Sequence, residues 1–88
     1  MTGIKRLVLD VQKPINMPLN ILATELANVH GVEGVDVHIQ EVEQKVESAR
    51  ITMEGENIDF EKARGVIETL GASIKSVDRI TCGKRIVG

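Results

Sequence analysis

The chain has 88 residues, of which 42% are hydrophobic, and its formal net charge is −2 from 11 basic and 13 acidic residues. It contains one Phe and no Trp or Tyr. Nucleic-acid-binding sheets stack bases on aromatic rings and hold phosphates with a basic surface, so this composition argues against a nucleic-acid partner. The length predicts a single domain, residues 1–88.

The cellular compartment is suggested by a lone cysteine and by the hydropathy pattern. Cys82 is the only cysteine, so an internal disulfide is impossible and a reducing compartment is expected. No run of apolar residues is long enough to span a membrane, and no apolar leader is recognisable. We therefore expect a cytoplasmic protein with no membrane partner.

The first half of the chain begins with a predicted strand over Ile4–Gln12, where successive side chains alternate between two faces. Proline has no N–H for a sheet ladder, so Lys13–Pro14 is expected to end this strand. A helix is predicted over Pro18–Val29, because apolar residues recur there at spacings of three and four, and His30–Gly31 ends it. The stripe of this helix consists of Leu19, Leu22, Leu26 and Val29.

A hairpin is predicted in the middle of the chain. Val32–Gly34 is expected to be a short connection, followed by strands over Val35–Lys45 and Val46–Glu54 with alternating apolar and polar residues. The turn between these strands is expected near Glu43–Lys45.

The last part of the chain predicts a helix over Ile58–Leu70, capped by Asn57 or Asp59. Gly65 lies inside this helix, where glycine costs about 1 kcal/mol relative to alanine, and close packing of the helix on the sheet is the expected reason. A final strand is predicted over Ser73–Cys82.

The final strand has an irregular pattern. Ile74 and Ile80 share one parity, whereas Val77 has the other. A β-bulge near Val77–Arg79 would reconcile the three residues, and edge strands often carry bulges.

The order strand, helix, strand, strand, helix, strand predicts an α+β fold, the ferredoxin-like βαββαβ sandwich. Its four-stranded antiparallel sheet has the order 4-1-3-2, and both helices cover the same face. The other face of the sheet is expected to be open, and it would carry Arg6, Val8, Asp10, Asp36, His38, Gln40, Ser48, Arg50 and Thr52.

Several segments, in this order and spacing, resemble an archaeal family of unknown function catalogued as domain of unknown function 211. They are Leu9–Pro14, Gly31–Val35, Ile58–Glu61, Ser76–Asp78 and Gly83–Lys84. The resemblance implies a ferredoxin-like fold and a homo-oligomer, with a ring as one form of assembly. It implies no activity and no catalytic residues.

A group of carboxylates with one imidazole is the best candidate for a metal site. Asp36 and His38 are two residues apart on one strand, so both point to the same face, and Asp10 and Asp78 belong to strands expected to adjoin each other. Calcium or magnesium would prefer the oxygen ligands, and zinc would favour His38. The alternative interpretation is that these residues form the solvated side of amphipathic strands, which alternation alone produces.

No phosphate-binding glycine loop and no Ser-His-Asp order is present, and Cys82 is interpreted as a structural thiol. We therefore expect a protein that is not an enzyme. The first functional hypothesis is a homo-oligomeric assembly or regulatory module that binds a small effector between subunits. The second is a protein that binds a divalent cation such as calcium through Asp10, Asp36, His38 and Asp78, with no other cofactor.

Overall fold

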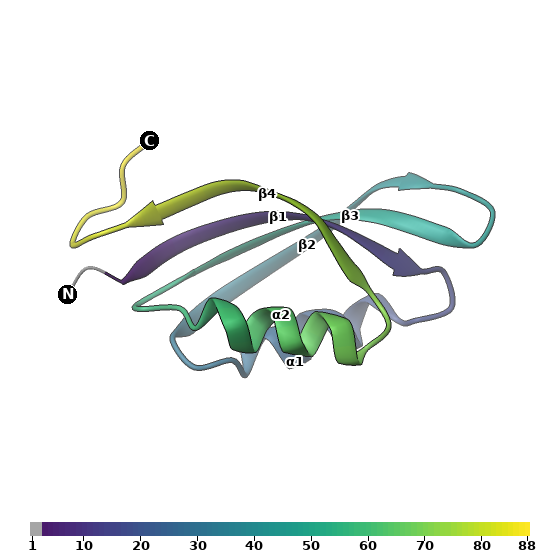
Figure 1. Ribbon diagram of the computed structural model, residues 1–88, viewed down its shortest axis with the longest axis horizontal. Coiled ribbons are helices and arrows are strands. Elements are labelled where there is room, and N and C mark those ends of the chain that lie inside the picture. The colour runs from purple at the N-terminus through teal and green to yellow at the C-terminus, as the bar shows by residue number, and fades with distance from the viewer. Residues whose placement is uncertain (1–2) are drawn as a thin grey trace.

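The computed structural model describes residues 3–88 and confirms the predicted order of elements (Figure 1). The elements are β1 (Ile4–Pro14), α1 (Leu19–Ala27), β2 (Val32–Val42), β3 (Val46–Gly55), α2 (Phe60–Thr69) and β4 (Ser73–Cys82). Neither helix in this part of the chain is long and apolar enough to cross a membrane.

The strands form one antiparallel sheet in the order β2-β3-β1-β4, which is the predicted order read from the other edge. Both helices lie on the same side of the sheet, with α1 packed on β2 and α2 on β4 (Figure 1). The ferredoxin-like α+β fold is thus confirmed, including its uncovered second face.

The core lies between the helices and the central strands. Alternation in β1 places Leu7, Leu9 and Val11 on the helix side, and all three are fully buried. The other members of the core include Leu22 and Leu26 of α1, Ile51 and Met53 of β3, and Ala63 and Ile67 of α2.

The start of β2 and the end of β1 differ from the predicted boundaries. Val32–Gly34 is not a connection, because Val32 pairs with Gly55 and Gly34 with Glu54 as the first part of β2. β1 continues through Pro14, which pairs with Val46 as the last residue of the strand, where a missing N–H costs little. The hairpin turn falls between Val42 and Val46, as expected.

Strand β4 contains the expected bulge and a second one. Val77 pairs with Leu9 and Arg79 with Val8, so Asp78 has no partner in β1. A further register shift leaves Lys75 unpaired in the same way. As a result Ile74, Val77 and Ile80, each three residues apart, lie opposite the core residues Val11, Leu9 and Leu7. Val77 therefore shares the helix side of the sheet with the two isoleucines.

Two glycines allow a close approach of backbone at the junction before α2. The carbonyl O of Gly31 accepts a hydrogen bond from the backbone N of Glu56 at 2.9 Å. A Cβ atom at Gly55 would lie 1.9 Å from that same oxygen, and Gly31 has a φ of +92°. These two positions therefore have physical reasons to be glycine.

Helix α2 is capped by Asp59, one of the two predicted candidates. A side-chain oxygen of Asp59 accepts a hydrogen bond from the backbone N of Lys62 at 3.1 Å. The expectation for Gly65 is wrong, because Gly65 is exposed and no atom of another element lies within 4 Å of the position that its Cβ would take.

One charged pair lies at the end of the core nearest the hairpin turn. Lys13 is only 2% exposed, and its Nζ forms an ion pair with Glu47 and donates to the carbonyl O of Pro14. Lys13 and Glu47 are direct partners across β1 and β3. A buried ammonium keeps its charge at low cost only when such partners are present.

Two glycine substitutions should change stability in opposite directions. We expect Gly65→Ala to raise the free energy of unfolding by about 0.5–1 kcal/mol, because alanine has the higher helix propensity and nothing obstructs its methyl group. Gly55→Ala should lower it by about 2–4 kcal/mol, because the new Cβ collides with the Gly31 carbonyl. Urea titrations at one fixed protein concentration measure both values, and a neutral Gly55→Ala would contradict the close approach.

The buried pair should be sensitive to the loss of one partner. We expect Glu47→Gln to destabilise the protein by about 2–4 kcal/mol, because it leaves the Lys13 ammonium without its carboxylate. Replacing both residues with Met should restore most of that loss, since no charge then remains to be compensated. The same urea titrations compare the three proteins; a double variant no more stable than Glu47→Gln would refute this reasoning.

Candidate functional site

The open face of the sheet is the candidate site, and the register places its side chains in rows. One row consists of His38, Arg50 and Asp10 across β2, β3 and β1, and the next of Asp36, Thr52 and Val8. On β4, Ser76 lies opposite Asp10 and Arg79 opposite Val8. The open face is therefore polar, and Val8 is an apolar residue in its middle.

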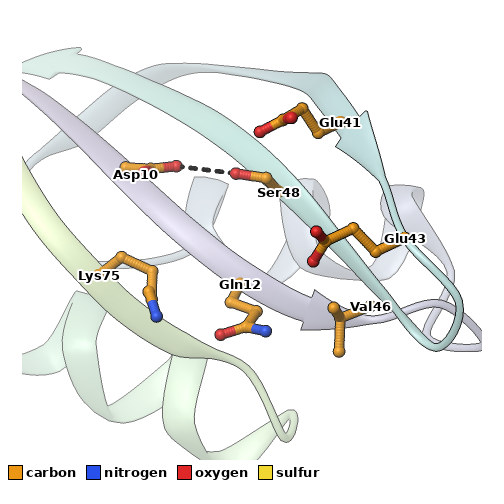
Figure 2. Close-up of a pocket in the computed structure, with 7 residues that line it drawn as sticks. All are labelled: Asp10, Gln12, Glu41, Glu43, Val46, Ser48 and Lys75. Atoms are coloured by element: carbon orange, nitrogen blue, oxygen red, sulfur yellow. Dashed lines mark hydrogen bonds between the residues drawn. The ribbon is translucent and has the colours of Figure 1, made fainter.

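An acidic hollow of about 140 Å³ lies at the hairpin end of this face (Figure 2). The carboxylate of Asp10 accepts a hydrogen bond from the Ser48 hydroxyl at 3.2 Å. Figure 2 shows the side chains of Glu41 and Glu43 on one side of this pair and Lys75, a bulge residue of β4, on the other. Gln12 and Val46 complete the lining. Three carboxylates and one ammonium give this hollow a negative charge.

A second hollow, of about 420 Å³, lies at the other end of the open face. It is lined by Arg6, Val8, Arg50, Thr52, Glu54, Asp78 and Arg79. We call this second hollow the arginine hollow. The open face is thus divided into an acidic end and an end rich in arginine, both bounded by strand β4.

The four residues predicted to bind a metal are spread over this face. Asp10 lines the acidic hollow and Asp78 lines the arginine hollow, where it accepts a hydrogen bond from Ser76 at 2.7 Å. Asp36 and His38 lie on the edge strand β2, and β3 with Arg50 separates them from Asp10. Positions two strands apart are about 9.5 Å from each other. Within residues 3–88, no three His, Cys, Asp or Glu side chains gather closely enough to hold a metal ion. The metal site stays a prediction, and it would need ligands from a second copy.

The arginine cluster was not predicted from the sequence. Arg6, Arg50 and Arg79 are far apart in the chain, and each occupies an ordinary polar position of an alternating strand. The basic pairs Lys5–Arg6 and Lys84–Arg85 are the only local signal of positive charge. The pairing of β3 and β4 with β1 brings the three guanidinium groups to one hollow, and the register of β4 depends on its bulges.

Strand β4 also exposes apolar side chains on its helix side. Val77 is 47% and Ile80 54% exposed, although they lie opposite the buried Leu9 and Leu7. Figure 1 shows that β4 runs back along α2 and continues beyond the N-terminal end of the helix, so the helix covers only the first part of the strand. Ile74, in that first part, packs against the core. An apolar strip therefore remains along this edge.

The geometry can hold polar ligands on the open face and an apolar partner along β4. Cys82 is exposed at the end of β4 and lines neither hollow of the open face. Its position gives no support for a role in either hollow.

Comparisons with known proteins give the family. Residues 5–88 match the model of the family DUF211, described as "Uncharacterized ArCR". An uncharacterized protein of Methanocaldococcus jannaschii is 36% identical over 87 residues, which cover 99% of this chain and 90% of that protein. The match extends over nearly the whole chain, so this protein belongs to the DUF211 family of uncharacterized archaeal proteins.

Proposed function

We propose that this protein is a non-catalytic module of the cytoplasm that assembles from several copies of itself and binds a small effector between them. The observation that carries this proposal is the apolar strip of Val77 and Ile80 on edge strand β4. A chain of this size buries only about 60–65% of its unfolded surface by itself, so further apolar burial against a copy would stabilise it.

The shape of β4 limits how a second copy can dock. Lys75 and Asp78 interrupt the strand as bulges, and bulges discourage long edge-to-edge pairing of backbones. The contact would therefore run mainly through side chains, with Val77 and Ile80 at its centre. Such a partner would also border both hollows of the open face, because Lys75, Asp78 and Arg79 belong to their linings.

The opposite edge of the molecule offers a different surface, to which the β4 edge of a neighbouring copy could bind. Strand β2 is the other edge of the sheet, and it exposes Val42, while α1 beneath it exposes Ile21. Contact between the β4 edge of one copy and the β2 edge of the next is heterologous. A repeated heterologous contact closes into a ring when its rotation allows it. We propose this head-to-tail arrangement.

Charged substitutions on β4 test the assembly. We expect the protein to elute as a species several times heavier than the 9.6 kDa chain, and Val77→Asp or Ile80→Asp to shift it toward the monomer. Size-exclusion chromatography with light scattering measures the mass. Asn16→Asp, which adds the same charge in the exposed loop between β1 and α1, should leave the mass unchanged. Both β4 positions are exposed, so circular dichroism should show a folded chain; a monomeric starting protein would disprove the proposal.

The second candidate is divalent-cation binding, and the acidic hollow at Asp10, Glu41 and Glu43 is the observation that favours it. These carboxylates would bind calcium only with ligands from a neighbouring copy, because Asp36 and His38 lie on β2 beyond Arg50 and Asp78 lines the other hollow. Calorimetric titration of chelator-treated protein with calcium, magnesium, zinc and manganese measures this binding. We expect heat with calcium and its loss in Asp10→Asn; no heat with any of the four ions would refute it.

A further inference from the structure

Three arginines surround one apolar floor at the arginine hollow. Val8 pairs with Arg79 of β4 and with Thr52 of β3. Arg6 lies two residues from Val8 along β1, and Arg50 lies two residues from Thr52 along β3, all on the open face. No helix covers this face, yet Val8 is only 9% exposed. Long arginine side chains cover apolar surface with their stems while their guanidinium groups stay at the rim.

Most donors of these guanidinium groups have no acceptor among residues 3–88. Each guanidinium offers five N–H donors. The Nε of Arg6 donates to Glu54 at 2.9 Å, and Nη1 of Arg6 and of Arg79 each donate to a backbone carbonyl. Arg50 makes no side-chain hydrogen bond or ion pair with any residue among 3–88. The hollow therefore presents a surplus of donors to the solvent.

The acceptor shared by Arg6 and Arg79 shows that their donors converge. Both Nη1 atoms lie near one atom, the carbonyl O of Gly88, at 3.3 and 3.4 Å. The same oxygen position is thus within reach of side chains from β1 and β4. An oxyanion placed there would accept charge-assisted hydrogen bonds from both guanidinium groups.

The charge of the lining limits which anion fits. Three arginines face two carboxylates, those of Glu54 and Asp78, and Glu54 is already paired with Arg6. This small positive excess suits a compact anion of one or two charges. A long polyanion such as a nucleic-acid backbone would also meet the acidic end of the same face.

We propose that the hollow formed by Arg6, Arg50 and Arg79 binds a compact oxyanion, a phosphate or carboxylate group of a small molecule. The planar guanidinium group of arginine matches the geometry of both phosphate and carboxylate. The guanidinium groups of Arg6 and Arg79 reach one oxygen position, which favours a ligand that accepts hydrogen bonds from both of them. Binding displaces the oxygen atom of Gly88 from Arg6 and Arg79. This oxyanion would be the small effector of the proposed function, and the inference rests on that function to this extent.

Calorimetric titration of the full chain, at constant ionic strength, tests the site with inorganic phosphate, pyrophosphate and succinate. We expect one saturable site per chain for phosphates or for the dicarboxylate, and no saturable binding of chloride. Comparing the three probes decides between the two sources of the oxyanion.

Substitutions of Arg50 then locate the site. Arg50→Gln should weaken binding about ten- to hundredfold, since it removes a charged donor fork, and Arg50→Lys should weaken it less. The matched control is Arg64→Gln, which removes the same charge from α2, where Arg64 pairs with Glu61 away from the hollow. Equal affinities of Arg50→Gln and Arg64→Gln would overturn the proposal.

Light scattering on the same samples separates this inference from the proposed assembly. Intact oligomers that bind none of the three probes would overturn the anion site and leave the assembly standing. Saturable binding by a monomer would support the anion site and refute the assembly. A third outcome is that the unsubstituted protein binds no anion and Arg50→Gln loses the oligomer. That outcome would overturn the inference, because the arginines would then belong to a contact between copies.

Discussion

The unbroken pairing of β1 with β3 is the constraint on which the rest of the structure depends. From Arg6 opposite Glu54 to Pro14 opposite Val46, these two central strands pair without a register shift. Their alternation directs Leu7, Leu9 and Val11 toward the helices and Arg6, Val8 and Asp10 toward the open face. Both outer strands adapt to this central pair through register shifts. The open face thus inherits its arrangement from two strands whose other side forms the core.

Much of this architecture could be predicted because it follows from local periodicity. The apolar stripes of the helices, the alternation of β1 and β3, and the turn after Val42 each leave a signal within a few residues. The bulge at Asp78 was also visible, since Val77 breaks the parity of Ile74 and Ile80. Ile74 and Val77 show the same parity break, so a single bulge could not place all three residues on one face, and the second shift, at Lys75, was missed.

The candidate sites were harder to predict because they depend on distances across strands. Asp36 and His38 share a face with Asp10, as expected, but strand order places Arg50 between them. The arginine cluster needs three strands in correct register, and no window of the sequence contains more than one of its members. The exposure of Val77 and Ile80 depends on how much of β4 is covered by α2, which their own apolar character does not reveal.

The buried ammonium of Lys13 also distinguishes between registers of β1 and β3 that the alternation of apolar residues leaves equally possible. Sliding β1 by two residues along β3 would keep every side chain on its present face, so the apolar pattern alone does not forbid it. Such a slide would place Lys13 opposite Ala49 in one direction or Lys45 in the other, instead of Glu47. A positive charge would then be enclosed beside a methyl group or near a second cation. One polar contact at the margin of the core thereby makes a single alignment of the central strands the favourable one.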